Sequence, residues 1–574
     1  MAKKIVIIGG VAAGPKSACR VKRLLPDAEV TIIDQDNLIS YGGCGIPYYV
    51  SGDVSDEKEL RNTSFHMTRD ESFFLNAKGV NVRTSTRAVA IDRASKTVAV
   101  EDVNTGATDS VPYDNLVIST GSRPNILPIP GVDLDGVFTI SDLHKAIAIK
   151  ERVAKGEVGK AVVIGGGAIG IEMAEAFADL WGLETTIIEF MPQLLPRLVD
   201  RPFAKMLETH LREQGVAVYT SESATAIEGE NGKVCRVVTP NRTLDADLVV
   251  MAVGVRARSE LASQAGLAVS QMGNIMVNDR LQTSDPNIYA AGDCIEVKNL
   301  LTGKGSIAPL GSLANREGRV VGDNLAGIPT TYKGWVGSFV MKAFERSIAA
   351  TGLSLETALA EGFAAAAAIT AQSDRAHFFP TQTVIPLRLV FDKSTRRVLG
   401  AQGFGPANDA VLARIDAAAG IIAKGGTIDD ISQLEMAYAP PFATALDALN
   451  AAGNVADNLA SGRLRYVSIE DFLDWMDDFS GQADWVALDI RHPKETAPFV
   501  EKFGDKWLSV PYIDIRSRYQ ELPKDKTMLI ICDAGTRSYE IQTFLDSVGY
   551  DNSLVLGGGF NVMRRLGVAW WPQS

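Results

Sequence analysis

The chain has 574 residues, 46% of them hydrophobic and 22% charged, which is typical of a globular protein with roughly three to four domains. Its formal net charge of −12 argues against a general nucleic-acid binder and against a protein that binds anionic membranes. The five cysteines form no C-x-x-C pair, which argues against a disulfide framework and a structural zinc site and indicates a reducing compartment. No apolar run approaches the ~18 residues of a membrane span, and the N-terminal run is too short for a signal peptide, so we expect a cytoplasmic protein.

The first predicted element is a dinucleotide-binding unit. A β-branched strand is expected over 4–8, a helix over 15–25, and a second strand over 30–33 that ends in Asp34. This is the order of a Rossmann unit, in which a helix N-terminus binds a pyrophosphate and the acid binds a ribose hydroxyl. Val11 stands where G-x-G-x-x-G has its middle glycine, so the motif is weak by itself. The predicted cofactor contacts are Gly9, Gly10, Ala12, Ala13, Gly14, Asp34 and Gln35.

Cys44 follows this unit in a glycine-rich loop. The glycines leave its sulfur reachable and let the backbone come close to a flat cofactor. Position +5, where flavin disulfide reductases with an internal dithiol have a second cysteine, is Tyr49. If Cys44 does redox chemistry, its sulfur partner must therefore come from outside the loop, as a small thiol, a persulfide or oxygen. The alternative is a buried cysteine that packs as a small hydrophobe.

A second dinucleotide-binding unit follows, with a strand over 161–164, a helix over 171–180 and a strand over 185–188 that ends in Glu189. Its glycine fingerprint is complete. Glu189 should accept hydrogen bonds from a free ribose 2′-hydroxyl and repel a 2′-phosphate. No arginine follows over 190–192, so NADH is favoured over NADPH. The predicted contacts are Gly165, Gly167, Ala168, Ile169, Gly170 and Glu189.

Further segments resemble the two-dinucleotide-fold flavoprotein family. Residues 119–124 and 252–255 resemble its paired strand-end turns, and 283–293 resembles its third FAD motif, whose final aspartate binds the ribityl chain. The resemblance implies FAD in the first unit and NADH in the second. It adds Cys44, Thr120, Gly121, Arg123, Asp293 and Ala314 to the FAD contacts and Gly254 to the NADH contacts.

Residues 324–455 resemble the interface domain of the same family, which makes homodimers. Strands are expected over 384–391 and 397–402, followed by helices over 410–423 and 428–435.

The Cys44 loop and the segment 436–442 together resemble coenzyme A disulfide reductases and the related persulfide reductases, over about residues 1–455. The resemblance implies that Cys44 forms a mixed disulfide with an external thiol. It also implies that Tyr438 reaches this cysteine from the partner subunit and can donate a proton to the leaving thiolate. Coenzyme A (CoA) carries phosphates and therefore needs cations. The positions that match the CoA contacts of the family are Lys16, Arg20, Arg23, Ser40, Gly43 and Lys78.

Two departures from this family concern the substrate. Phe378-Phe379-Pro380 stands where relatives have Tyr-Tyr-Pro, and Leu446-Asp447 stands where they have lysine-aspartate. A proton donor and a cation are thereby lost. CoA and a bulkier, more apolar or differently protonated thiol remain alternative substrates.

After a polar linker, expected over 456–465, a strand over 485–491 and a strand over 528–531 are predicted, and the latter ends in Cys532. A six-residue loop leading into a helix would give Cys532 a cradle of backbone N–H groups that stabilises a thiolate or persulfide anion. This loop resembles rhodanese, as do Asp489, Arg491 and the segment Leu556-Gly557-Gly558-Gly559-Phe560. The resemblance implies that Cys532 carries sulfane sulfur and that Arg537 orients the loop or pairs with an anionic donor. Phosphatase chemistry, found on a related fold, is the alternative.

The predicted fold is α/β, with two Rossmann-like domains, an α+β dimerisation domain and a C-terminal rhodanese-like domain. Their expected ranges are 1–149 with 250–323 for FAD, 150–249 for NADH, 324–455 for dimerisation and 466–574 for the rhodanese-like domain. The leading function is NADH-driven reduction of persulfides, polysulfides or CoA-linked sulfur at Cys44, with Cys532 binding or handing over sulfane sulfur. Alternatives are a CoA disulfide reductase, an NADH oxidase or peroxidase, and a non-catalytic sulfur carrier or redox sensor. The peroxidase branch has a histidine where Ala12 stands. No metal, nucleic-acid or membrane partner is expected.

Overall fold

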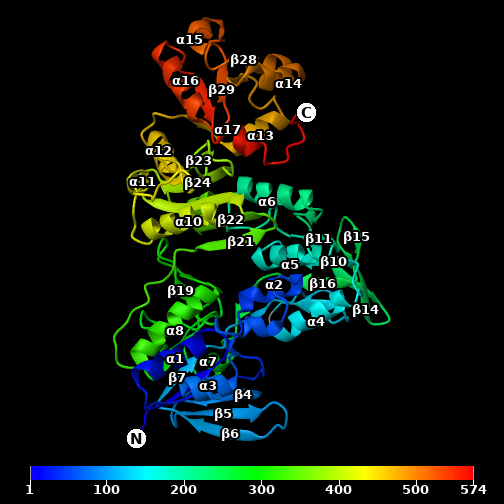
Figure 1. The fold of residues 1–574 in the computed structure, drawn as a ribbon, viewed down its shortest axis with the longest axis vertical. Coiled ribbons are helices and arrows are strands. Elements are labelled where there is room, and N and C mark those ends of the chain that lie inside the picture. Colours follow the sequence, from blue (N-terminus) through cyan, green and yellow to red (C-terminus); the bar gives the residue numbers. More distant parts are fainter. Residues whose placement is uncertain (1, 141, 573–574) are drawn as a thin grey trace. The chain divides into compact units, whose positions relative to one another are not determined.

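The computed structural model describes residues 2–140 and 142–572, which group into two compact units (Figure 1). The first unit runs to Phe190 and continues over Gly215–Trp335, and the second consists of Met191–Gln214 and the chain from Val336 on. Within the described residues, no helix is long and apolar enough to cross a membrane.

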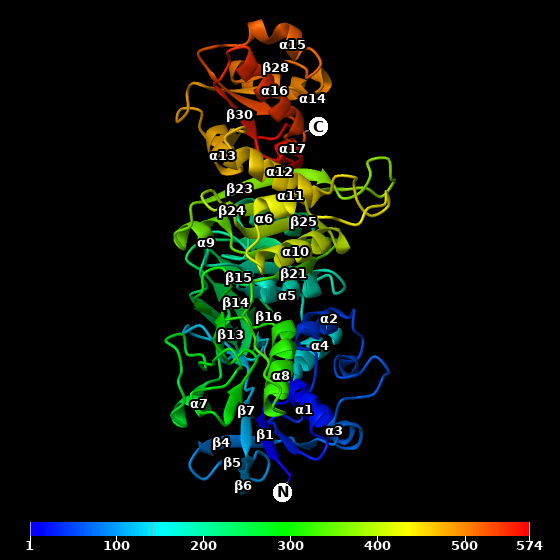
Figure 2. The same cartoon turned by 90° about the vertical axis from the view of Figure 1, so that its left-hand side faces the viewer.

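A five-stranded parallel sheet organises the start of the first unit. Its strands, in spatial order, are β18 (Ile288–Ala290), β7 (Asn115–Ile118), β1 (Lys4–Ile8), β2 (Glu29–Ile33) and β3 (Asn81–Arg83). Continuous burial along β1 is typical of a parallel sheet covered on both faces. Helices α1 (Ala13–Leu24) and α8 (Gly311–Leu325) pack side by side (Figure 2). Gly318 allows this contact, because a Cβ there would lie 2.6 Å from the carbonyl oxygen of Ala13.

A second parallel sheet of five strands carries the other dinucleotide fingerprint. Its strands are β12 (Ala217–Tyr219), β11 (Glu184–Ile188), β10 (Lys160–Ile164), β16 (Leu248–Met251) and β9 (Val137–Thr139). Helix α5 (Ala168–Ala178) begins before the predicted residue 171, because the extended Gly167 is its N-cap. It packs against α2 (Ile46–Ser51), the short helix that follows Cys44.

Small elements complete the first unit. Two antiparallel three-stranded sheets comprise β4 (Thr86–Asp92), β5 (Thr97–Asp102) and β6 (Thr108–Pro112), and β13 (Ala226–Glu230), β14 (Lys233–Val238) and β15 (Thr243–Asp245). The strand pairs are β8 (Ser122–Pro124) with β17 (Val255–Ala257), and β19 (Val297–Lys298) with β20 (Gly305–Ser306). The further helices are α3 (Glu71–Lys78), α4 (Leu143–Ala154), α7 (Glu260–Gln264) and the 3-10 turns Gly43–Gly45 and Glu57–Leu60.

The second unit contains a five-stranded antiparallel sheet. Its strands are β21 (Phe339–Ala343), β22 (Arg346–Gly352), β25 (Val398–Pro406), β24 (Val384–Asp392) and β23 (Ala365–Ser373). The helices of this part are α9 (Leu355–Ala360), α10 (Asp409–Ile422), α11 (Ile428–Ser432) and α12 (Ala448–Ala460). The alanine run that begins β23 is therefore strand, and the helix predicted over 428–435 ends at Ser432.

Residues 191–214 differ from the domain prediction, which placed them with NADH. They contain α6 (Arg201–Glu213) and belong to the second unit. The reason is a buried polar contact, because Asp200, the N-cap of α6, accepts a 2.8 Å hydrogen bond from Gln402 Nε2 and lies 3.1 Å from Arg388 Nε. Residues 150–249 therefore do not form a single compact unit in the structure.

The linker prediction over 456–465 is wrong in its first half, because α12 is helical to Ala460. Asp447 caps this helix by accepting the Leu449 N–H at 2.9 Å, and the helix packs on β23 and β24. Its many alanines favour helix in spite of the asparagines that suggested a linker.

The C-terminal part of the second unit is a parallel α/β sheet with strand order β26-β30-β29-β27-β28. The strands are β26 (Tyr466–Val467), β30 (Ser553–Leu556), β29 (Thr527–Ile531), β27 (Trp485–Asp489) and β28 (Trp507–Ser509). Its helices are α13 (Ile469–Asp477), α14 (Pro493–Phe503), α15 (Ile515–Arg518), α16 (Thr536–Ser547) and α17 (Gly559–Met563), with 3-10 turns at Gly504–Lys506 and Tyr519–Glu521. It contacts the antiparallel sheet directly, since Tyr466 Oη donates to the carbonyl oxygen of Ile369 at 3.0 Å.

Candidate active site

The glycine turn before α1 has room for a phosphate group. Gly9 has a φ of 112°, in the left-handed region that favours glycine. A Cβ on Gly14 would lie 2.0 Å from the carbonyl oxygen of Gly9, so only glycine fits there. Ala12, the N-cap of α1, provides no side-chain acceptor for the first N–H groups of the helix. These groups, at the positive end of the helix dipole, suit the pyrophosphate of FAD.

Two partly buried carboxylates stand where FAD should meet the first unit. Asp34, after β2, accepts hydrogen bonds from the N–H groups of Gly10 at 2.6 Å and Asp36 at 2.9 Å. Asp293 accepts one from Ser122 Oγ at 2.9 Å. Burial raises the pKa of both acids. A carboxylate has room for about four hydrogen bonds, so each can still accept from a ribose or ribityl hydroxyl.

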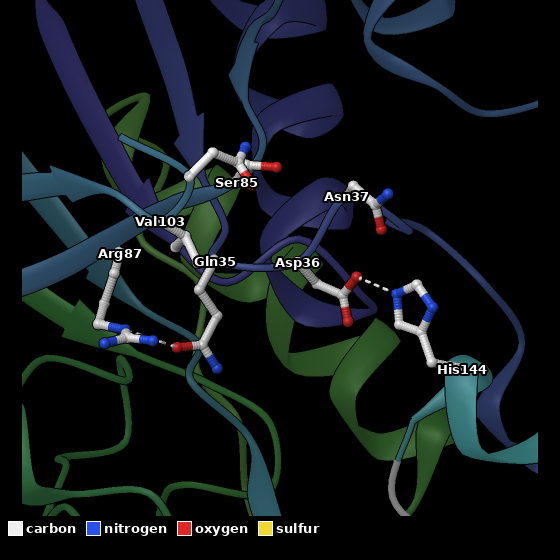
Figure 3. Close-up of a pocket in the computed structure, with 8 residues that line it drawn as sticks. Gln35, Asp36, Asn37, Ser85, Arg87, Val103 and His144 are labelled. Atoms are coloured by element: carbon white, nitrogen blue, oxygen red, sulfur yellow. Dashed lines mark hydrogen bonds and ion pairs between the residues drawn. The ribbon is translucent and has the colours of Figure 1, made fainter. Parts of the chain in front are cut away.

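A cavity of about 400 Å³ opens beside the end of β2 (Figure 3). Arg87 Nε donates to Gln35 Oε1 at 3.4 Å, and His144 Nε2 lies 2.8 Å from Asp36 Oδ1. The cavity is lined by Gln35, Asp36, Asn37, Ser85, Arg87, Val103, Asn104 and His144. Arg87 and His144 were not predicted, because they come from β4 and from α4, far from the glycine motif in sequence.

Glu317 of α8 is a second unpredicted residue next to the FAD motif. Its Oε2 accepts the Gly292 N–H at 2.7 Å, and the residue is 1% exposed. Burial, together with the charge of the neighbouring Asp293, raises the pKa of this carboxyl to about 7. Glu317 therefore holds the backbone that presents Asp293.

The Glu317 carboxyl predicts a pH dependence of stability. Its proton is lost at a lower pH in the unfolded chain than in the folded protein. Between pH 4.5 and about 7 the folded state therefore binds more protons, and the free energy of unfolding falls as pH rises. Glu317→Gln should remove this decline, which amounts to about 3 kcal/mol in the free energy of unfolding across the window. Chemical unfolding of both proteins at several pH values across this window measures the difference, and parallel curves would contradict the assignment.

The remaining FAD positions lie close to these acids. Thr120 Oγ1 donates to the carbonyl oxygen of Arg258 at 2.6 Å, and Gly121 has a φ of 68°. Ala314 of α8 is buried, and a Cβ on Gly292 would lie 3.8 Å from its Cβ. Arg123 is ion-paired with Glu260. The structure thus brings Thr120, Gly121 and Ala314 to the same strand ends as Asp293.

The second fingerprint repeats the geometry of the first. Gly165 has a φ of 114°, and a Cβ on Gly170 would lie 2.0 Å from its carbonyl oxygen. Glu189 is buried, and its Oε2 accepts the Gly166 N–H at 2.6 Å. Gly254 has a φ of 86°. Ala168 and Ile169 begin α5, whose N-cap Gly167 leaves the first N–H groups without a side-chain acceptor. This arrangement suits the second dinucleotide.

Cys44 is exposed, in the 3-10 turn Gly43–Gly45 that leads into α2. A Cβ on Gly311, the first residue of α8, would lie 3.7 Å from its sulfur. The N-cap of α8 is Leu310, which has no side-chain oxygen, so the positive end of this helix faces the Cys44 region. Tyr49, at +5, is buried. All five cysteines are free thiols.

Tyr48 and Glu172, which were not predicted, lie close to this region, since the charges of Glu172 and Cys44 both act on Tyr48. Burial raises the pKa of Tyr48 to about 12, and the charges of Glu172, Glu175 and Cys44 act in the same direction. Burial and the charge of Glu175 raise the pKa of Glu172 to about 7. Glu172 is therefore a carboxyl that holds a proton near neutral pH.

The basic residues that are expected to bind CoA do not all face the same way. Burial raises the pKa of the Cys19 thiol, and the charges of Lys78, Arg23 and Lys16 oppose this rise, so the three cations lie near Cys19. Arg20 instead points at α8, with its Nε 2.5 Å from Asp323 Oδ1. Gly43 is exposed, whereas Ser40 is buried with a φ of 53°. A contact of Arg20 with CoA would compete with its ion pair.

An exposed apolar patch surrounds Tyr438 in the second unit. We define the tyrosine patch as Phe378, Tyr438, Phe442 and Leu446, each of which is more than half exposed. The Ala376 N–H donates to the carbonyl oxygen of Pro440 at 3.2 Å, which places the two sequence departures on neighbouring segments. Asp447, beside Leu446, has a structural role, because it pairs with Arg414 at 2.6 Å.

Cys532 is 1% exposed at the end of β29. The Gly535 N–H donates to its sulfur at 3.1 Å, as expected of a loop that stabilises a thiolate. The loop is shorter than the six residues predicted, because α16 begins at Thr536 and already contains Arg537. Arg537 Nη2 lies 2.5 Å from Asp533 Oδ2. Asp489 and Arg491 form a buried ion pair in the same domain.

Known proteins resemble this chain over most of its length. The sequence model of the pyridine nucleotide-disulphide oxidoreductase family matches residues 3–312, and the model of its dimerisation domain matches residues 340–449. A protein of Pyrococcus horikoshii named NAD(P)H coenzyme A polysulfide/persulfide reductase is 38% identical over 78% of this chain and 97% of its own length. The structure of an NAD-dependent persulfide reductase from A. fulgidus is similar with a TM-score of 0.91, at 38% identity over 97% of this chain and 99% of its own. The crystal structure of reduced Bacillus anthracis CoADR-RHD is similar with a TM-score of 0.90, at 31% identity over 99% of this chain and 98% of its own.

Proposed function

Because the chain belongs to the pyridine nucleotide-disulphide oxidoreductase family, we propose that it is an FAD enzyme that uses NADH to reduce persulfides at Cys44. The exposed, single Cys44, whose sulfur lies near the first residue of α8, carries the proposal, since Tyr49 leaves no second cysteine in the loop. The relatives named as persulfide reductases support the choice of substrate.

FAD binds at the α1 turn with Asp34 and Asp293, and NADH binds at the α5 turn with Glu189. Bound FAD supplies two-electron transfer between NADH and the sulfur at Cys44. Lys16, Arg23 and Lys78 would hold the phosphates of a CoA substrate.

The chemistry at Cys44 needs two steps. The Cys44 thiolate attacks the inner sulfur of a persulfide R–S–SH, which forms Cys44–S–S–R and expels hydrosulfide. The electron pair from NADH then breaks this disulfide, so that Cys44 leaves as a thiolate and the released R–S⁻ takes up a proton to give R–SH. Tyr438 of the partner subunit donates that proton, which agrees with its exposure on this chain and with the family's dimerisation domain. The net reaction converts NADH and R–S–SH to NAD⁺, R–SH and hydrosulfide.

Cys532 binds or hands over sulfane sulfur in the C-terminal domain. Its support is the Gly535 N–H aimed at a buried sulfur at a strand end, in an α/β domain that the two similar solved structures also cover.

The acceptor is tested by NADH consumption under anaerobic conditions with CoA persulfide, polysulfide and CoA disulfide, with sulfide quantified. We expect fast turnover with CoA persulfide and little with CoA disulfide, because the tyrosine patch replaces a tyrosine and a lysine of the CoA disulfide reductases by Phe378 and Leu446. Fast turnover with CoA disulfide alone would instead establish a thiol-homeostasis enzyme. Turnover only after oxygen is admitted would establish an NADH oxidase.

Glu189 should set the preference for NADH. Glu189→Gln should lower kcat/KM for NADH about tenfold, because a charged hydrogen bond to the ribose is lost, and should raise it for NADPH. The ratio of the two kcat/KM values measures this. Glu184→Gln, at the exposed start of the same strand, is the control and should leave the ratio unchanged. An unchanged ratio in Glu189→Gln would contradict the role.

A further inference from the structure

Asp533, the residue directly after Cys532, places a carboxylate at the sulfur-binding loop. It lies 2.5 Å from Nη2 of Arg537, which belongs to α16, and 3.3 Å from Nη2 of Arg564, which directly follows α17. The carboxylate therefore pairs with two guanidinium groups from different elements. The Phe560 and Asn561 N–H groups donate to the carbonyl oxygens of Cys532 and Asp533, at 3.0 and 2.8 Å, and keep these segments together.

The charges linked to this loop cancel. Arg564 Nη2 also lies 3.6 Å from Glu495 Oε1, and Glu495 lies 3.8 Å from Arg491 Nη1. Arg491 is paired at 2.7 Å with Asp489. The network therefore contains three guanidinium groups and three carboxylates: Arg491, Arg537 and Arg564 with Asp489, Asp533 and Glu495. Neighbouring Arg565 donates to the backbone carbonyls of Asn561 and Val384.

The charge balance of this network affects which sulfur donor the loop can bind. Thiosulfate presents two negative charges on its reacting group and needs a cation that is free to bind the sulfonate oxygens. An organic persulfide presents at most one negative charge there, and its leaving group is the thiolate R–S⁻. We propose that Asp533, by occupying Arg537 and Arg564, makes the Cys532 site selective for organic persulfides over thiosulfate; this selectivity rests on the proposed role of Cys532 as a sulfur carrier.

The two transfers differ only in the leaving group. With a persulfide, the Cys532 thiolate attacks the outer sulfur of R–S–SH, a new S–S bond forms, and R–S⁻ leaves. With thiosulfate, the same thiolate attacks the sulfane sulfur and sulfite leaves. No net oxidation occurs in either case. The Gly535 N–H that bonds to the sulfur serves both reactions. The difference therefore arises outside the reacting sulfur atoms, where the oxygens of sulfite would have to lie.

The Asp533 ion pairs are partly exposed, so an incoming anion could open them at small cost. Opening them would leave the Asp533 carboxylate next to the bound dianion. Like charges so close repel each other, and the penalty falls on thiosulfate much more than on a persulfide. Selectivity thus follows from the acid itself rather than from a lack of arginines.

The test uses the full-length flavoprotein and measures thiocyanate formation from cyanide with thiosulfate or with glutathione persulfide. Asp533→Asn and Asp533→Ala should each raise kcat/KM for thiosulfate at least about tenfold and change the persulfide value less than about threefold. Asp525→Asn, on the turn before β29 at the opposite end of that strand from Cys532, removes one charge from the same domain and should change neither value. Retained transfer from glutathione persulfide shows that the C-terminal domain of the variants is folded, and NADH-driven turnover at Cys44 shows the same for the first unit.

Cys532→Ala separates the two possible failures. If it forms thiocyanate as fast as the wild type with both donors, Cys532 is not the carrier, and the proposed role of this domain fails together with the selectivity. If Cys532→Ala is inactive but both Asp533 variants keep the wild-type ratio of donors, the selectivity alone is overturned.

Discussion

Cys44→Ser should lower NADH-driven sulfide release about a thousandfold or more, while the protein keeps its FAD. Serine cannot form the mixed disulfide that joins the thiol moiety of the substrate to the protein. Its hydroxyl fits the exposed 3-10 turn, so the fold and the flavin site should not change. The rate of sulfide release and the flavin absorbance per protein measure the two effects.

Cys235→Ser is the matched control, because Cys235 lies in the small antiparallel sheet on β14 and bonds only weakly to the Glu228 carbonyl oxygen at 3.5 Å. It should keep full activity. Sulfide release by Cys44→Ser within threefold of the wild type would show that the reaction occurs elsewhere. Loss of activity in both variants would point to a general effect of removing thiols.

Gly14→Ala should abolish flavin binding and destabilise the first unit by about 3 kcal/mol. Its Cβ would lie 2.0 Å from the Gly9 carbonyl oxygen and 2.7 Å from Ser119 Oγ. Backbone must therefore move, and the first turn of α1 would no longer meet the pyrophosphate. Flavin content after purification and the midpoint of thermal unfolding measure the two effects.

Gly420→Ala is the control for this prediction. Gly420 lies inside α10, and a Cβ there meets nothing within 4 Å. It should keep the flavin and gain up to about 1 kcal/mol of stability, because alanine favours helix over glycine. A Gly14→Ala protein with normal flavin content would show that the turn tolerates a side chain and that the pyrophosphate lies elsewhere.

The dinucleotide units could be predicted from sequence because their signals are local. β1, β2, β10 and β11 are short β-branched runs, and Asp34 and Glu189 follow two of them directly. The contacts that complete the sites could not be predicted. The Gly292–Glu317 hydrogen bond and the Asp36–His144 contact join residues far apart in sequence, and no local sequence pattern indicates them.

In the C-terminal region, the motif residues were predicted from sequence, but the boundaries of the elements around them were wrong. Cys532 and Arg537 were expected from their motif, yet the loop length was wrong, because Thr536 already begins α16. The linker was wrong because its asparagines outweighed its alanines in the sequence interpretation, whereas packing on β23 and β24 decides for helix. One of the two ion pairs of Asp533 is with Arg564, which only the fold brings to the loop.

The most direct test of the proposed chemistry is to mix the anaerobic enzyme with CoA persulfide before any NADH is added. We predict one sulfide released per Cys44 and a CoA adduct on the Cys44 peptide by mass spectrometry, and NADH should then release CoA and restore the thiol. No sulfide before NADH, or an adduct on a different cysteine with Cys44 unmodified, would contradict the proposal that Cys44 accepts the thiol moiety of the persulfide.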